Sequence, residues 1–286
     1  MKQSKKLLSS LMLLIVVVFS TFSFAKAQDN PEEKLGWKLG AQAYSFNRFT
    51  FAEAVAKTDS CKLKYIEAFP GQEIGGGIAG KMDFTMSPDT RDQVLALLKS
   101  KGVTLVAYGV VNADTPDGWR QLFEFAKAMN IKNINTEPKQ EDLPLIGKLA
   151  NEYKIKVSIH NHPNPTHYWS PEIVLNAIQM ANSKYVGACA DIGHWVRSGL
   201  DPIVCLQKYK GHINHLHFKD LNEKSKDAHD VHWGTGISNV KGVMQELKNQ
   251  KFKGMLSAEY EYNWLNNAPD IAASAANFRE IVKELR

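Results

Sequence analysis

Carboxylate and imidazole side chains recur near the ends of short apolar segments in the second half of this 286-residue chain. The segment 185–191 ends in Asp191, and the segment 213–219 has His217 close to its end. Carboxylates and imidazoles that converge on one point are costly unless a cation neutralises them. Because Asp, Glu and His are ligand types for Mn, Zn, Co or Mg, the pattern predicts a divalent-metal site.

The same feature is present in four of the last five predicted strands. A single histidine or carboxylate at such a position is more often a structural residue, but the joint occurrence is fairly specific. The candidate residues are Glu137, His160, His162, Asp191, His194, His215, His217, Glu259 and Glu261.

A regular alternation of strands and helices is needed to bring these residues together. Strands are predicted at 38–45, 64–68, 103–108, 132–136, 155–161, 185–191, 213–219 and 254–260. Helices are predicted between them at 51–59, 87–101, 115–129, 140–153, 170–182, 201–209, 238–249 and 268–285. Eight such units predict an α/β fold of the (β/α)8 TIM-barrel type, with catalytic groups at the carboxyl ends of the strands. A doubly wound sheet is the alternative, but no Gly-rich turn follows the first strand.

Three motifs resemble the xylose isomerase-like sugar isomerase/epimerase superfamily: Asp191-x-x-His194, His215-Leu-His217-Phe-Lys219-Asp220 and Glu259-Tyr-Glu261. Its members include tagatose epimerases, hydroxypyruvate isomerases and inosose dehydratases, and apurinic endonucleases are relatives. The resemblance covers essentially the whole chain after residue 27. It implies the metal ligands Glu137, Asp191, His217 and Glu259. It also implies that Glu137 and Glu259 form an acid/base pair on opposite faces of the substrate.

Other residues beside these motifs are candidates for substrate binding. They are His160, His194, Lys219, Trp195 and Trp233, of which the two tryptophans could stack on a sugar ring. His194 could equally be structural, and Lys219 either pairs with Asp220 or stabilises charge on the substrate. Glu261 shares a strand face with Glu259, so the ligand on the last strand could be either residue. We prefer Glu259.

The first 27 residues have the features of a secretory signal: a basic start, an apolar stretch and Ala25-Lys26-Ala27 as the cleavage site. They predict a periplasmic or secreted protein without a stable membrane anchor after cleavage, and a single catalytic domain at 28–286. The segment contains four lysines and no acidic residue, so a net charge of +5 falls to +1 after cleavage. A nearly neutral chain has no electrostatic footprint for nucleic acid.

Two further features concern the fold more than the chemistry. The three cysteines, Cys61, Cys189 and Cys205, are too few and too widely spaced to predict a disulfide framework, and Cys189 and Cys205 are expected in the core. The Gly-rich segment 71–80 is either a connection or a mobile flap over the barrel mouth. The strands ending at 67–69 and 108–109 lack the additional histidine ligands of apurinic endonucleases, which disfavours DNA repair.

The favoured function is that of a metal-dependent sugar isomerase or epimerase that removes a proton next to a carbonyl. The alternative is a lyase that eliminates the aglycone from a 3-keto-glycoside with the same metal site. A second alternative is a non-catalytic sugar-binding barrel. In each case the partner is a small carbohydrate, and a homo-oligomer is possible.

Overall fold

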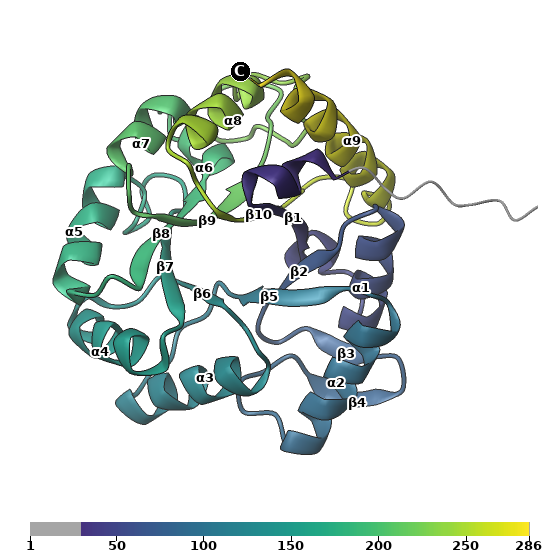
Figure 1. The fold of residues 1–286 in the computed structure, drawn as a ribbon, viewed down its shortest axis with the longest axis vertical. Helices are drawn as coiled ribbons and strands as arrows, with labels where there is room; N and C mark the ends of the chain where they lie inside the picture. The colour runs from purple at the N-terminus through teal and green to yellow at the C-terminus, as the bar shows by residue number, and fades with distance from the viewer. Residues whose placement is uncertain (1–29, 286) are drawn as a thin grey trace, which may run out of the picture.

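Eight parallel strands close into a barrel that is ringed by helices in the computed structural model, which describes residues 30–285 (Figure 1). The order around the barrel is β1-β10-β9-β8-β7-β6-β5-β2. The strands are β1 (Trp37–Gln42), β2 (Tyr65–Ala68), β5 (Thr104–Tyr108), β6 (Asn133–Thr136), β7 (Lys156–His160), β8 (Val186–Asp191), β9 (Ile213–Phe218) and β10 (Gly254–Ala258). The predicted TIM barrel is confirmed, while the predicted signal segment lies outside the described residues.

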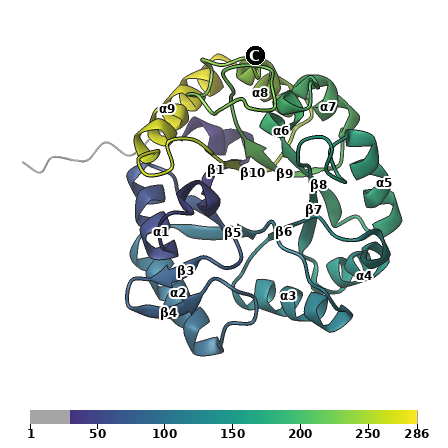
Figure 2. The same cartoon turned by 180° about the vertical axis from the view of Figure 1, so that it is seen from behind.

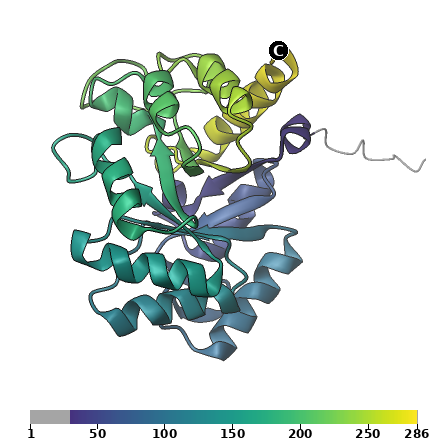
Figure 3. The ribbon, with the colours of Figure 1, turned by 60° about the vertical axis from the view of Figure 1, so that its left-hand side comes forward.

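The helices form the outer layer, as the views from behind and from the side show (Figures 2 and 3). They are α1 (Phe51–Ser60), α2 (Pro88–Ser100), α3 (Pro116–Ala128), α4 (Leu143–Tyr153), α5 (Pro171–Ala181), α6 (Ile192–Arg197), α7 (Pro202–Lys208), α8 (Val240–Asn249) and α9 (Ala268–Glu284). Short 3-10 helices lie at Pro31–Leu35, Ala43–Phe46 and Gln140–Asp142. Ser87 and Ser170 cap α2 and α5 by accepting a backbone N–H, and proline follows each of them. All eight predicted helices are present.

The hydrophobic core fills the space between the barrel and this outer layer. Aromatic residues of α3 and α9 are fully buried in it, among them Trp119, Phe123 and Phe278. The three cysteines are buried and free, as expected for Cys189 and Cys205. No helix within residues 30–285 is both long and apolar enough to cross a membrane.

A β-hairpin and a short helix near the site were not foreseen from the sequence. The Gly-rich segment forms an antiparallel hairpin of β3 (Glu73–Gly75) and β4 (Ile78–Lys81), in which Gly75 and Gly76 adopt positive φ angles of 68° and 62°. The base of the hairpin is held because the Met82 N–H donates to the Gln72 carbonyl. The second element is α6, which begins directly after Asp191 and carries two of the candidate residues.

Candidate metal centre and active site

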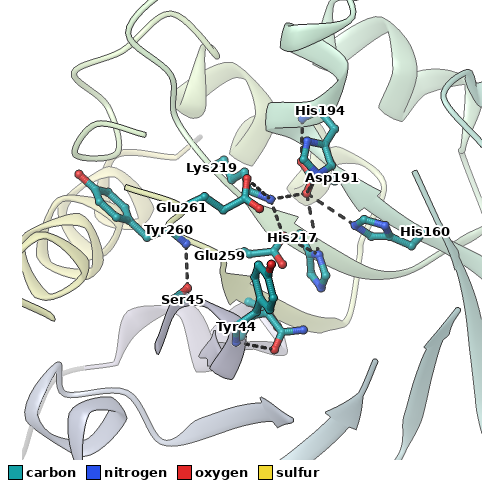
Figure 4. A network of polar contacts seen from close by, with 12 residues as sticks. Tyr44, Ser45, His160, Asp191, His194, His217, Lys219, Glu259, Tyr260 and Glu261 are labelled. Atoms are coloured by element: carbon teal, nitrogen blue, oxygen red, sulfur yellow. Dashed lines mark hydrogen bonds and ion pairs between the residues drawn. The ribbon is translucent and has the colours of Figure 1, made fainter. Parts of the chain in front are cut away.

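Asp191, His217 and Glu259 meet at the carboxyl end of the barrel (Figure 4). Asp191 is the last residue of β8 and lies opposite His217 of β9 in the register, while Glu259 directly follows β10. The His217 Nδ1 atom is 3.0 Å from Glu259 Oε2 and 3.9 Å from Asp191 Oδ2. All three side chains are buried, and Glu259 retains 7% exposure. The strand-end pattern therefore identified three side chains that do converge.

The spacing of Asp191 and His194 has a local structural reason. Asp191 is the N-cap of α6, and its Oδ1 atom accepts the His194 backbone N–H at 2.8 Å. The Asn161 side chain holds the Asp191 backbone on both sides, accepting its N–H at 2.9 Å and donating to its carbonyl at 3.0 Å. These bonds leave Oδ2 facing the site, 3.6 Å from His160 Nε2 and 3.5 Å from His194 Nε2.

The Lys219 ammonium lies between the Asp191 and Glu259 carboxylates, donating to both, with Asp191 Oδ2 at 2.5 Å. The side chain is fully buried, and its stem packs on Gly193. A Cβ atom at Gly193 would lie only 2.7 Å from Lys219 Cδ, so a larger residue there would displace the lysine. Burial disfavours the charged ammonium, but Asp191, Glu259 and Glu261 together hold the pKa of Lys219 above its usual range.

Asp220 has a separate role from its neighbour. Its Oδ2 atom accepts the backbone N–H groups of Gly234 and Gly236, and its Oδ1 atom accepts that of Ser238. Asp220 thus organises the loop 221–239, and Lys219 forms its ion pairs with the site carboxylates instead.

Glu67 of β2 is a site residue that the sequence reasoning missed. Its fully buried carboxylate lies 3.1 Å from His217 Nε2 and 2.8 Å from His215 Nε2, and it accepts hydrogen bonds from Ser257 and Asn135. Burial alone would raise the pKa of Glu67, but His217 and His215 hold it well below its usual range. An ionised Glu67 can only accept, so Nε2 of His217 carries a proton. Burial disfavours the charged ring, but the surrounding groups, Glu259 and Glu67 among them, hold the pKa of His217 well above its usual range, so a cation would bind at Nδ1 in place of a proton.

The donor set fits a divalent cation. Two buried imidazole atoms, His160 Nε2 and His217 Nδ1, have no hydrogen-bond partner, although both face the Asp191 carboxylate. Donor atoms of His160, Asp191, His194 and Glu259 all lie within 4.8 Å of one another. Unpartnered imidazole nitrogens beside ionised carboxylates are the ligand chemistry of Mn, Zn and Co, and carboxylates alone suit Mg.

Glu137 is placed at the edge of this group. Its carboxylate contacts His160 Nδ1 at 2.8 Å and also His162, and these three residues form a second donor group. Burial raises the pKa of Glu137, but hydrogen bonds from His160 and His162 lower it overall to about 2. Of the four predicted ligands, Asp191, His217 and Glu259 therefore lie together. Glu137 is set apart from Asp191, because His160 lies between them.

The two candidate carboxylates after β10 differ in their partners. Glu259 contacts His217 and Lys219, whereas the Glu261 carboxylate accepts from Arg197 Nη1 at 2.7 Å. Burial raises the pKa of Glu259, but His217 and Lys219 hold it well below its usual value. Glu259 is thus an ionised carboxylate within the donor group, while Glu261 lies beside it, paired with an arginine.

The prediction for the two tryptophans needs correction. Trp195 is fully buried against Tyr209, and Trp233 is buried between Phe218 and Phe278. Neither ring presents a face to a sugar. Both tryptophans were predicted because they lie close to the motifs in the sequence, and this closeness does not determine which way a side chain points.

Different aromatic residues lie at the mouth. A cavity of about 410 Å³ has Glu259, Glu261 and His162 in its lining, and Tyr44 and Phe69 form part of its wall. Tyr44 is 41% exposed, and its ring packs edge-on against Phe69 and Trp264, with centroids 5.2 and 6.0 Å away. Tyr44 lies two residues after the end of β1, so the strand-end test would have found it if aromatic residues had been included.

Comparison with known proteins gives a family for this arrangement. The family described as "Xylose isomerase-like TIM barrel" matches residues 55–281. An inosose dehydratase of Clostridium tetani (strain Massachusetts / E88) is 40% identical over 96 residues, which is 32% of either chain. Inosose dehydratase 2 of Bacillus cereus (strain ZK / E33L) is 29% identical over 167 residues, 51% of this chain and 56% of the relative. The chain thus matches about a third to a half of these relatives' length.

Solved structures extend the similarity over most of the chain. An uncharacterised protein of Parabacteroides distasonis ATCC 8503 is 34% identical with a TM-score of 0.70, covering 87% of this chain and 99% of that one. A D-tagatose 3-epimerase-like protein is 20% identical with a TM-score of 0.68, covering 86% and 98%. A barrel protein of Mycobacterium smegmatis in complex with magnesium is 12% identical with a TM-score of 0.70, covering 90% and 99%. The last two share the fold.

Proposed function

The chain belongs to the xylose isomerase-like TIM-barrel family, and on that premise we propose that it is a divalent-cation-dependent sugar isomerase or epimerase. The proposal is supported above all by the convergence of Asp191, His217 and Glu259 around unpartnered imidazole atoms beside an open cavity. The substrate is a ketose or an oxidised sugar that carries a C–H next to its carbonyl.

Glu259 is the group proposed to take this proton. It is ionised, since its pKa lies well below the usual range, and it lines the mouth cavity. Glu137 is proposed as the second acid/base group, and its carboxylate contacts the half-exposed His162. Lys219 would place a positive charge near the substrate oxygen on which negative charge develops.

Asp191, His217 and Glu259 would hold the cation, with Glu137 as the fourth ligand that the family resemblance implies. A divalent cation held there would polarise the substrate carbonyl and acidify the neighbouring C–H. Glu67 would orient His217 for this role through the Nε2 hydrogen bond, and it does not contact the substrate itself.

A lyase is the second candidate, and the relatives' names favour it. Dehydration of an inosose, like loss of an aglycone from a 3-keto-glycoside, begins with the same proton removal and ends with loss of a leaving group. The residues described above fit both outcomes, so the product distinguishes them. A sugar-binding barrel without catalysis is the third possibility, and it predicts binding without exchange.

Proton NMR in heavy water tests the proposal. The mature protein, loaded with Mn or Mg, is incubated with a panel of ketoses, with an inosose and with a 3-keto-glucoside. Deuterium uptake next to the carbonyl with a new isomer supports the isomerase, and release of water or aglycone supports the lyase. Sugar binding without any exchange would contradict both.

Two neighbouring variants test the site. Glu259→Gln removes the proposed base and should lower exchange by about 10²–10⁴-fold, as expected for loss of a general base. Glu261→Gln removes the adjacent carboxylate, which pairs with Arg197, and should retain most of the activity. Circular dichroism and thermal unfolding confirm that both variants fold. Equal activity of Glu259→Gln and the unmodified protein would refute the assignment.

Export remains part of the proposal. If residues 1–27 direct secretion, the substrate is encountered outside the cytoplasm, where free or glycosidic sugars are more plausible than phosphorylated ones. Amino-terminal sequencing of the protein from a fractionated native culture would identify the mature start and its compartment.

A further inference from the structure

The amino ends of the barrel strands surround a second cavity, at the opposite end of the barrel from Asp191 and Glu259. Figures 1 and 2 look along the barrel from its two ends. The cavity has a volume of about 480 Å³, within the range of small-molecule sites. Its lining comes largely from strand starts and the residues just before them, among them Lys38, Tyr65, Lys132, Lys156 and Lys253.

Four lysines and no acidic residue line this cavity: Lys38, Lys132, Lys156 and Lys253. Within residues 30–285, none of the four forms an ion pair with a carboxylate. Other surface lysines of the same region do so, for example Lys64 with Glu33 at 3.2 Å. Uncompensated positive charge is thus concentrated around one hollow.

The lysines influence one another. Burial lowers the pKa of Lys156, and the charge of Lys38 lowers it further, so these two ammonium groups lie close enough to repel. Like charges gathered around a cavity are relieved when an ion of opposite sign enters. Positive side chains are thus grouped at this end of the barrel, whereas carboxylates are grouped at the other end.

The walls between the lysines are apolar. Leu105, Val106 and Met255 line the hollow, and the Tyr65 ring lies 5.9 Å from the Lys38 Nζ atom. Among the described residues the Tyr65 hydroxyl has no hydrogen-bond partner. Burial, and then the charge of Glu33, raises the pKa of Tyr65, so this hydroxyl remains a donor.

The Lys253 stem is held in place by the backbone. Gly36 has a φ of 79°, and a Cβ atom there would come within 3.0 Å of Lys253 Cγ. The stem therefore lies directly on Gly36, and this packing reduces the conformational freedom that an exposed lysine would lose on binding.

We propose that this cavity binds a small organic anion, with its carboxylate, sulfonate or phosphate among the lysines and an apolar ring or chain against Leu105, Val106 and Met255. The charge of the lysines and the donor of Tyr65 select the anionic head, and the apolar walls select the body. This site is independent of the proposed enzyme activity.

A fluorescent anion tests the proposal. 8-Anilinonaphthalene-1-sulfonate combines a sulfonate with apolar rings and should bind the mature folded protein saturably, with one site per chain. Lys38→Gln/Lys156→Gln should weaken binding by about tenfold or more, the loss expected for charged hydrogen bonds. Lys127→Gln/Lys148→Gln removes two exposed lysines of α3 and α4 and should leave binding unchanged. Lys38→Arg/Lys156→Arg should restore it.

Competition separates charge from apolar contact. Benzoate should displace the dye, and benzyl alcohol, which is similar in shape but neutral, should not. Equal dye affinity in the Gln and control variants, or equal displacement by benzoate and benzyl alcohol, would overturn the proposal. If the double variant fails to fold by circular dichroism, Lys253→Gln serves as the single variant with the same expected direction.

Discussion

The two ends of the barrel carry opposite charge patterns. At the carboxyl end, carboxylates and imidazoles are buried and contact one another around the Lys219 ammonium. At the amino end, four lysines surround a partly apolar hollow without carboxylates. Because all eight strands run in the same direction, residues at strand starts meet at one end and residues at strand ends at the other. Lysines at strand starts and carboxylates at strand ends are therefore placed at opposite ends of the barrel by their positions along the strands.

Burial makes this difference energetically important. Removing a charge from the carboxyl end leaves buried partners without compensation, which is costly. Removing one from the amino end only reduces repulsion among solvent-accessible groups, which contributes little. Removing a charge at the carboxyl end should therefore lower the stability strongly, whereas the matched change at the amino end should alter it little.

The largest effect is expected for Lys219→Met. This change leaves Asp191 and Glu259 buried beside each other without the ammonium, and loss of one partner of a buried ion pair costs about 3–5 kcal/mol. Urea unfolding of the metal-free protein, followed by tryptophan fluorescence, measures the loss. Adding Mn²⁺ should recover part of it, because a cation bound by the same carboxylates replaces the missing charge.

Lys156→Met is the matched variant at the amino end. It removes the same charge from a lysine that the Lys38 charge already disfavours, so its unfolding free energy should change by less than about 1 kcal/mol. An equal loss of stability in both variants would remove the contrast between the two ends. Failure of Mn²⁺ to stabilise Lys219→Met would argue against a cation between Asp191 and Glu259.

A smaller effect is expected for Glu67→Gln. The Nε2 atoms of His215 and His217 now face the Glu67 carboxylate. A glutamine amide would offer them either an N–H donor or a weaker acceptor oxygen, so His217 would lose its fixed orientation. Loss of such an outer partner typically lowers metal affinity about 10–100-fold. Isothermal titration calorimetry with Mn²⁺ measures the change. Ser257→Ala removes one donor to Glu67 and one contact to His215 Nε2, but it leaves both contacts between Glu67 and the imidazoles, so its effect should be clearly smaller.

The sequence predicted the scaffold better than the site. Parallel strands and amphipathic helices leave local patterns, and all eight strands were found close to their observed bounds. The test for charged residues at strand ends found Asp191, His217 and Glu259 because backbone direction alone brings those positions together. It could not show that Lys219 would lie between the carboxylates, since that depends on the stem packing over Gly193.

The missed features share a different cause. Glu67 was considered only as a position where a histidine ligand is absent, although it lies inside the barrel beneath His217. Trp195 and Trp233 were chosen for their closeness in sequence to the motifs, and sequence distance says nothing about which way a ring points. The amino-end lysines lie at, or within one residue of, the first residue of their strands, and they could have been found by the same reasoning applied to strand starts.

A pH-dependent effect concerns Asp230, a buried carboxyl group at the carboxyl end with incomplete compensation. Its Oδ2 atom accepts the Glu261 N–H at 3.1 Å and lies 3.6 Å from Arg197, but its buried Oδ1 atom has no hydrogen-bond partner. Burial raises the pKa of Asp230 to about 7, only partly offset by Lys219 and Arg197. In the unfolded chain the pKa of an aspartate is ~3.9.

Between these two pKa values the folded protein holds a proton that the unfolded chain releases, so stability from Asp230 is full below pH ~4 and is lost as the pH rises through about 7. Asp230→Asn cannot ionise and should lack this dependence. From pH 5 to pH 7 the stability of the variant relative to the unmodified protein should rise by at most about 1.4 kcal/mol per pH unit, measured by urea unfolding. Asp227→Asn, an exposed change of the same charge, should follow the unmodified protein. Parallel curves for all three proteins would mean that Arg197 compensates Asp230 fully, and the carboxyl end would then contain no uncompensated charge at this position.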